Sequence, residues 1–266
     1  MSFSGDEIER YARHLVLHEI GGPGQQRLKA ARIAVIGAGG LGSPAILYLA
    51  AAGAGRITVI DDDHVSLSNL QRQVLHATAD VGRPKTESAA EHVAALNPHV
   101  AVDGVAERLE EANAERLLAG HDLVLDGSDS FATRGLVNRA AVALGIPLVS
   151  AAIGRWEGQL SVFDPASGTP CYACVFPEPP DPSMVPACAE AGVLGAMAGV
   201  MGAMQAVEAV KLVTGAGEPL RGRLLLYDAL GAESRTMRIA RDPACPVCGE
   251  AQSEAGGQAR STQTSR

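Results

Sequence analysis

The clearest chemical signal is a glycine-rich turn between an apolar run and a helical pattern. The stretch AVIGAGGLGS, residues 34–43, carries Gly37, Gly39 and Gly42 in the spacing G-x-G-x-x-G. Glycines let the backbone approach a phosphate, and the amino terminus of the following helix attracts its charge. The next apolar run ends in an acidic triplet, residues 61–63, where a carboxylate can accept hydrogen bonds from ribose hydroxyls. The pattern predicts a nucleotide site and fits a dinucleotide as well as an adenine nucleotide.

Two cations after the acidic triplet favour a triphosphate. Arg72 lies in SLSNLQRQ, residues 66–73, and Lys85 ends GRPK, residues 82–85. A triphosphate brings more negative charge than a glycine turn neutralises, whereas the turn alone can hold a pyrophosphate. No Walker-type sequence G-x-x-x-x-G-K-[ST] occurs. We therefore expect ATP; the alternatives are that both cations are solvated surface residues and that the turn only packs.

A second acidic site follows an apolar run in LVLDGSDSFATR, residues 123–134. This run would deliver Asp126 and Asp129 to the carboxyl end of a strand, where open parallel sheets bind ligands. A carboxylate at that place could hold Mg²⁺ that bridges nucleotide phosphates. The alternative is an N-cap of the next helix, formed by Ser128, Asp129 or Ser130.

Four of the five cysteines form two CxxC pairs, Cys171 with Cys174 and Cys245 with Cys248. This spacing is typical of a Cys₄ zinc site, which would hold the C-terminal segment against the body of the protein. A pair of redox dithiols is the alternative. The fifth cysteine, Cys188, fits either a buried apolar position or a nucleophile with a thiol role.

Alternating strands and helices must position these groups. Strands are expected at residues 32–36, 56–60, 101–105, 123–126 and 147–150, and helices near residues 44–52, 85–96, 112–119 and 133–144. After Trp156 the pattern changes to QLSVFDP, a glycine-rich helix to about Thr214, and the strands RLLLYD and SRTMRIA. The predicted fold is α/β, with a Rossmann-like, mostly parallel sheet, helices on both faces and a C-terminal antiparallel portion that carries the cysteines.

The N-terminal segment predicts an amphipathic helix over residues 6–19 that the sequence GGPG, residues 21–24, would end. The last 16 residues, 251–266, contain nothing to bury and are expected to be a disordered tail. The apolar face of the N-terminal helix would consist of Ile8, Ala12, Leu15 and Val16.

Composition narrows the class of protein. The net charge is −8 and no basic run occurs, which argues against a nucleic-acid partner. The first residues, MSFSGDEIER, do not resemble a secretory signal, so we expect a cytoplasmic protein with reduced cysteines. Residues 191–207 carry no charge after Glu190 and contain Gly195 and Gly199 in a GxxxG spacing. We interpret this segment as a buried helix with close backbone contacts, not as a membrane span.

Taken together, the motifs resemble those of the MoeB/ThiF family, the bacterial relatives of ubiquitin-activating enzymes. The resemblance implies an adenylyltransferase that uses ATP and Mg²⁺ to adenylate the C-terminal Gly-Gly carboxylate of a ubiquitin-like sulfur carrier. The carrier would be MoaD-like, for molybdenum cofactor biosynthesis, or ThiS-like, for thiamin. The motifs are RYARHLVL, GAGGLGS, IDDDHVSLSNLQRQ, VGRPK, NPHV, DGSDSFATR, PLVSAAI, EGQLSVF, CYAC, CAEAGVLG, YDA and CPVCGE.

The resemblance also implies roles at the nucleotide. Gly40 joins the phosphate turn and Asp61 holds the ribose. The phosphates are contacted by Asn69, Arg72 and Lys85. The carrier carboxylate attacks the α-phosphorus in line and pyrophosphate leaves, so catalysis consists of positioning and charge neutralisation.

Further roles concern metals and subunits. The resemblance implies that Asp129 binds magnesium and that Arg13 reaches the ATP of the neighbouring subunit, which requires a homodimer. It makes residues 1–30 an arm, residues 31–155 the nucleotide-binding part and residues 156–250 the carrier-binding and zinc part of one domain. Sulfur would come from a separate donor protein. The implied zinc ligands are Cys171, Cys174, Cys245 and Cys248.

Several alternatives stay open. Ser130 stands where the family more often has an amide residue, so any contact of that amide is missing here. In thiamin-branch relatives the cysteine at the position of Cys188 joins the carrier covalently, although adenylation does not need it. The molybdopterin branch is our interpretation, with the thiamin branch and a tRNA-modifying dehydratase as near alternatives. More distant ones are a nicotinamide-dependent dehydrogenase and a nucleotide-bound zinc scaffold without turnover.

Overall fold

The computed structural model of the protein describes residues 2–178 and 192–249, so Cys188 and the predicted tail lie outside the described residues. Their strands form one eight-stranded sheet in the order β3-β2-β1-β4-β5-β6-β7-β8. The first five are parallel, and β6 to β8 join antiparallel. The bounds are β1 Arg32–Ile36, β2 Arg56–Ile60, β3 Ala101–Val105, β4 Leu123–Asp126, β5 Leu148–Ile153, β6 Glu157–Phe163, β7 Arg223–Asp228 and β8 Glu233–Arg238.

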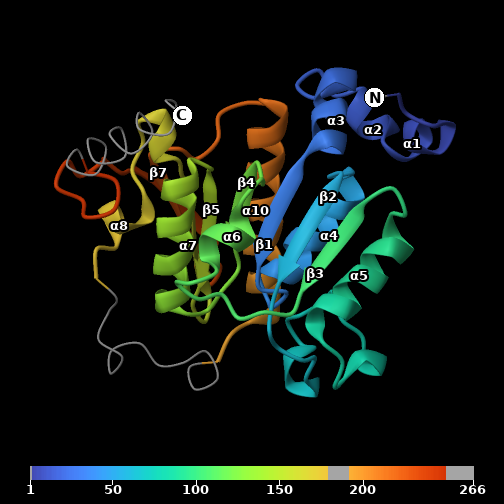
Figure 1. Cartoon of the computed structure of the whole chain (residues 1–266), viewed down its shortest axis with the longest axis horizontal. Coiled ribbons are helices and arrows are strands. Elements are labelled where there is room, and N and C mark those ends of the chain that lie inside the picture. Colours follow the sequence, from blue (N-terminus) through green and yellow to red (C-terminus); the bar gives the residue numbers. More distant parts are fainter. Residues whose placement is uncertain (1, 179–191, 250–266) are drawn as a thin grey trace, which may run out of the picture.

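Helices cover both faces of this sheet (Figure 1). Helices α4, α5 and α10 pack on one face, and α6, α7 and α8 pack on the other. The helical bounds are α1 Gly5–Arg10, α2 Ala12–Leu15, α3 Gly21–Ala30, α4 Gly42–Ala52, α5 Lys85–Leu96, α6 Ala114–Leu118, α7 Phe131–Leu144, α8 Tyr172–Val175 and α10 Gly195–Thr214, with short 3₁₀ turns η1 Leu67–Asn69, η2 Thr78–Asp80 and η3 Pro165–Ser167.

The central strands explain why the sheet is parallel. In β1, Ile33 and Val35 join the core on the α4 side, while Ala34 and Ile36 join the core on the α7 side. A strand buried on both faces is apolar throughout, which is the pattern of parallel sheets covered by helices. The predicted α/β fold is confirmed, including the antiparallel C-terminal portion.

Helix α10 is long and apolar enough to cross a membrane by length and composition. In the structure it packs against α4 and β5, and Glu208 on it is buried. A Cβ on Gly195 would lie 2.1 Å from the Gln71 carbonyl oxygen, and one on Gly202 would lie 2.2 Å from that of Leu41. No described atom lies within 4 Å of the corresponding position on Gly199. Close backbone contact is therefore real at Gly195 and at Gly202, but the expectation for Gly199 is wrong.

The N-terminal segment differs from its prediction. Instead of one helix over residues 6–19 there are two short helices separated by Tyr11, and the GGPG sequence begins α3. Ile8 and Val16, which were expected on the apolar face of that helix, are 51% and 78% exposed, whereas Tyr11 is buried. Pro23 is tolerated because the amide groups of the first helical turn have no partner within the helix.

Candidate active site

The glycine turn follows β1 at the carboxyl edge of the parallel strands. Gly37 has a φ of +86°, a conformation that side chains disfavour. A Cβ on Gly42 would lie only 1.8 Å from the Gly37 carbonyl oxygen, so the start of α4 packs directly on the turn. The glycines at these two positions are thus required by backbone geometry, as the G-x-G-x-x-G spacing predicts.

Asp61, at the end of β2, contacts the turn. Its Oδ2 accepts a 2.7 Å hydrogen bond from the Ala38 amide, and its Oδ1 accepts one of 2.8 Å from the Asp63 amide. Lys85 Nζ lies 2.9 Å from Asp63 Oδ2 and 3.8 Å from Asp61 Oδ2. Lys85 is buried, so it is not a solvated surface cation. A buried ammonium group needs such carboxylate partners, and these place its charge beside the turn.

Arg72 packs on the same turn from the loop after η1. A Cβ on Gly40 would lie 3.6 Å from Arg72 Cδ and 3.2 Å from Ala198 Cβ of α10. Arg72 is partly buried, and its Nη1 donates to the Ser68 carbonyl at 3.4 Å. Asn69 is partly buried at the end of η1, and its backbone carbonyl accepts a 3.0 Å hydrogen bond from the Arg72 amide. Two cations thus approach the turn from different elements.

The loop after β4 lies at the same carboxyl edge of the sheet as the glycine turn. A Cβ on Gly127 would lie 3.0 Å from the Gly42 nitrogen, so this loop touches the glycine turn. Asp129 lies two residues further on and is exposed. The N-cap of α7 is Ser130, whose Oγ accepts from the Thr133 amide at 3.4 Å. Within residues 2–178 and 192–249 the Asp129 carboxylate has no hydrogen bond or ion pair, so it does not serve as the cap.

Arg134, for which the sequence indicated no role, holds this loop through hydrogen bonds to backbone carbonyls. Its guanidinium is buried and donates to the Ser128 carbonyl at 2.6 Å and to the Ala151 carbonyl at 2.7 Å. It also lies 3.8 Å from the buried Asp126 Oδ2, which has no hydrogen-bond partner among the described residues. The feature of the sequence that could have indicated this role is a charged residue, Arg134, near the start of the largely apolar helix α7.

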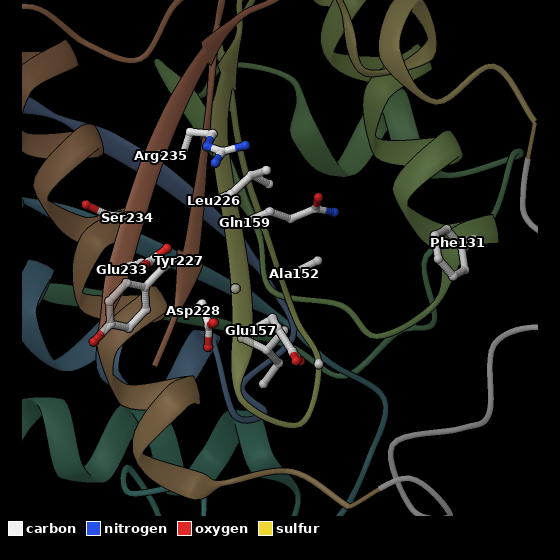
Figure 2. A pocket seen from close by; sticks show the side chains of 13 residues that line it. Phe131, Ala152, Glu157, Gln159, Leu226, Tyr227, Asp228, Glu233, Ser234 and Arg235 are labelled. Atoms are coloured by element: carbon white, nitrogen blue, oxygen red, sulfur yellow. The ribbon is translucent and has the colours of Figure 1, made fainter. Parts of the chain in front are cut away.

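A pocket of about 710 Å³ opens beside the same loop. Its floor is a row of directly paired residues, one from each of β5 to β8, and Phe131 forms the opposite wall (Figure 2). Phe131 comes two residues after Asp129, so the pocket begins next to the carboxyl edge. The paired floor residues are Ala152, Gln159, Leu226 and Arg235.

Arg13 is not part of this arrangement. It is exposed on α2, and α1, α2 and α3 lie together beside the start of β1 (Figure 1). The glycine turn follows the other end of β1. The structure therefore brings together all of the predicted nucleotide-site residues except Arg13.

The two CxxC pairs come together away from this edge. The Sγ atoms of Cys171 and Cys245 are 3.7 Å apart, and those of Cys174 and Cys248 are 3.4 Å apart. All four sulfur atoms lie within 4.8 Å of one another. Sulfurs bound tetrahedrally to zinc at 2.3 Å are about 3.8 Å apart, so the cluster fits one metal ion.

The surroundings of the cluster support a metal as well. Despite burial, backbone hydrogen bonds from Cys248 and Val247 lower the pKa of Cys245, as a metal-bound thiolate requires, whereas burial raises the pKa of the Cys171 and Cys174 thiols. Asn138 Nδ2 approaches Cys171 Sγ at 3.7 Å, and Asn138 Oδ1 accepts the Tyr172 amide at 2.9 Å. Such outer contacts orient metal ligands.

The model of the ThiF family matches residues 11–247. A sulfur carrier protein adenylyltransferase of Thermus thermophilus is 49% identical, with 94% of each chain covered. The molybdopterin-synthase adenylyltransferase of Escherichia coli is 44% identical, with 93% of this chain and 98% of that one covered. E. coli MccB, solved with AMPCPP and MccA, superposes with a TM-score of 0.79 at 25% identity, covering 90% of this chain and 74% of that one.

Proposed function

The chain belongs to the ThiF family, and from this premise we propose that it adenylates the C-terminal glycine carboxylate of a ubiquitin-like sulfur carrier protein, with ATP as the donor and pyrophosphate as the product. The observation that carries the proposal is one continuous edge. The glycine turn, Arg72, Lys85 and the Asp129 loop meet there, and the pocket opens beside Phe131. The Thermus and E. coli relatives carry the names of such adenylyltransferases.

ATP would lie along the glycine turn, with its ribose at Asp61. Each Asp61 oxygen accepts one backbone hydrogen bond, and a carboxylate oxygen can accept a second from a ribose hydroxyl. Arg72, Lys85 and Asn69 would contact the phosphates. Two cations held against the turn suit a triphosphate better than a nicotinamide dinucleotide, which disfavours a dehydrogenase.

Catalysis would consist of positioning and charge neutralisation. The carrier carboxylate is ionised at neutral pH and needs no general base to attack the α-phosphorus. Asp129, exposed and free of described partners, is the residue we assign to Mg²⁺. When bound, the ion would neutralise charge on the leaving pyrophosphate. Arg134 keeps the loop of Asp129 in place through the Ser128 carbonyl.

The carrier tail would reach the nucleotide through the pocket. We expect an extended Gly-Gly terminus, which carries no side chains, to pass Phe131 and approach the loop of Asp129. The body of the carrier would then rest on the β5–β8 surface, where Glu157, Asp228 and Arg235 offer charged contacts. The MoaD-like carrier remains our choice, with the ThiS-like carrier as the alternative.

A homodimer would bring Arg13 to the partner's ATP. On α10, Val200 and Val207 are 40% and 56% exposed, and Tyr48 on the neighbouring α4 is 60% exposed. This apolar outer face suits a second copy of the chain. An arginine supplied in trans can stabilise transferring phosphates.

The cysteine cluster would hold one structural Zn²⁺ that joins α8 to the segment of Cys245 and Cys248. It lies on elements separate from the nucleotide edge, so we assign it a role in stability and none in the chemical step. A Cys₄ site needs reduced thiols, and we therefore place the enzyme in the cytoplasm.

The test is carrier-dependent exchange of pyrophosphate into ATP. The protein is purified and mixed with a MoaD-like or a ThiS-like carrier from its own genome, and labelled pyrophosphate is followed into ATP. Exchange is expected with at least one carrier and should vanish when the carrier's last glycine is deleted. Exchange without any carrier, or none with either one, would contradict the proposal. The carrier that supports exchange also decides between the molybdopterin and thiamin branches.

A further inference from the structure

Both backbone polar groups of Ala38, inside the glycine turn, are held by side chains from other elements. The Ala38 amide donates to Asp61 Oδ2 at 2.7 Å. The Ala38 carbonyl lies 3.0 Å from His76 Nε2 and accepts from Ser43 Oγ at 3.2 Å. Ala38 itself is fully buried. Side chains of other elements therefore fix the conformation of the turn. One of them is His76, which has no role in the mechanism proposed above.

The partners of His76 determine where its proton lies. A carbonyl oxygen only accepts hydrogen bonds, so Nε2 must carry the hydrogen that it donates to Ala38. His76 Nδ1 lies 2.8 Å from Ser88 Oγ and, in the neutral ring, accepts from that hydroxyl. Burial lowers the pKa of His76, which keeps the ring neutral at physiological pH. His76 and Ser88 are both buried, so water does not compete for these bonds.

The same ring joins two parts of the nucleotide edge. His76 lies between η1 and η2, and Ser88 lies in the first turn of α5. That helix begins at Lys85, the buried cation beside Asp61. One imidazole thus connects the glycine turn to helix α5, which carries Lys85.

We propose that His76 is a positioning residue that holds the Ala38 peptide, and with it the glycine turn, in register with Lys85 for binding ATP phosphates. This role rests on the ATP site proposed above. His76 does not contact ATP itself. Its contribution is preorganisation, because a turn already held in place loses less conformational freedom when the phosphates bind.

Two near-isosteric variants separate the two bonds of the ring. In His76→Gln the amide nitrogen takes about the place of Nε2 and can still donate to Ala38. In His76→Asn it takes about the place of Nδ1, and the bond to Ala38 is lost. We expect His76→Asn to raise the Kd for ATP, measured by calorimetry, roughly five- to tenfold. His76→Gln should stay within about twofold of the wild type.

His121 offers a matched control. It is also buried and bridges two groups, with Nδ1 3.0 Å from the Leu118 carbonyl and Nε2 2.7 Å from Thr58 Oγ1, but neither group lies in the turn. His121→Asn should lower the thermal midpoint as His76→Asn does while leaving the Kd for ATP unchanged.

The outcomes are distinct. A His76→Asn protein that is destabilised but binds ATP like the wild type would show that His76 is only structural, and so would equal losses in the Asn and Gln variants. If the wild-type protein itself did not bind ATP, the ATP site would be wrong and the role of His76 would fall with it. Rescue by glutamine, together with unchanged binding in the His121 variant, supports the proposal.

Discussion

The Asn97 side-chain amide donates a 2.9 Å hydrogen bond to the Tyr11 hydroxyl, and both residues are buried. Tyr11 also packs on Gly53, where a Cβ would lie 2.5 Å from the ring. Gly53 ends α4, whose other end packs on the glycine turn. Helix α4 has 11 residues and is about 16 Å long. Tyr11 is therefore held at the end of α4 that lies away from the glycine turn of its own chain.

This anchoring gives the first prediction, that Arg13 acts on the partner's site. Arg13→Ala and Asp129→Asn proteins, each nearly inactive, are mixed under conditions in which dimers exchange. Half of the dimers would then be mixed, and each would contain one site with both native residues. Pyrophosphate exchange should return to about one quarter of the wild-type level per site. A mixture as inactive as its components would show that Arg13 acts within its own chain or has no role.

The second prediction separates magnesium binding from helix capping. Asp129→Asn should reduce carrier-dependent exchange by roughly 10²-fold or more, because the assigned magnesium ligand loses its charge. Its thermal midpoint should stay close to the wild-type value, since Ser130 and not Asp129 caps α7. Ser130→Ala is the matched control and should cost about 1 kcal/mol of stability with a smaller loss of exchange. Normal turnover of the Asp129 variant would remove Asp129 from the mechanism.

The third prediction concerns the cysteine cluster. Metal analysis of freshly purified protein should find one zinc per chain. Cys245→Ser, or treatment with a strong chelator, should release the metal and lower the thermal midpoint, because metal binding contributes to folding free energy. The Kd for ATP of the protein that remains folded should be unchanged, since the cluster lies away from the glycine turn. Zinc-free protein with full stability would contradict a structural site.

A fourth prediction follows from the ion pair that ties α1 to α3. Glu7 Oε1 lies 2.7 Å from Lys29 Nζ, and Glu7 also belongs to the capping box with Ser4. The Lys29 hydrogen bond and the Ser4 amide hold the pKa of Glu7 below its usual 4.5. A lowered pKa contributes stability above the unfolded value, and this is lost as the pH falls through the folded value.

The measurement compares Glu7→Gln with the wild type across pH. The variant should be less stable than the wild type at pH 7, and the difference in thermal midpoint should shrink below about pH 4.5. Glu111→Gln is the control, because Glu111 pairs with Arg139 on the exposed surface, where an ion pair contributes little. A difference for Glu7→Gln that is constant with pH would show that the carboxylate charge is not what stabilises the arm.

The sequence by itself determined the features that depend on local pattern. Runs such as residues 33–36 are apolar at successive positions, which requires burial on both faces and therefore a parallel sheet covered by helices. The G-x-G-x-x-G spacing identified the turn because Gly37 needs a positive φ and Gly42 has no room for a Cβ. The two CxxC pairs identified the cluster because thiolate spacing reflects metal geometry.

Only the tertiary structure decided which distant groups meet. Lys85 pairs with Asp63, Ser130 and not Asp129 caps α7, and Gly202 rather than Gly199 allows close approach of α10. His76 meets the Ala38 carbonyl, and Tyr11 meets Asn97 although 86 positions separate them. Periodicity in a sequence reports how each segment is buried, but not which partner buries it. Those partners are set by the packing of α4, α5 and α10 on the sheet, which places the nucleotide residues at one edge and Arg13 at the other.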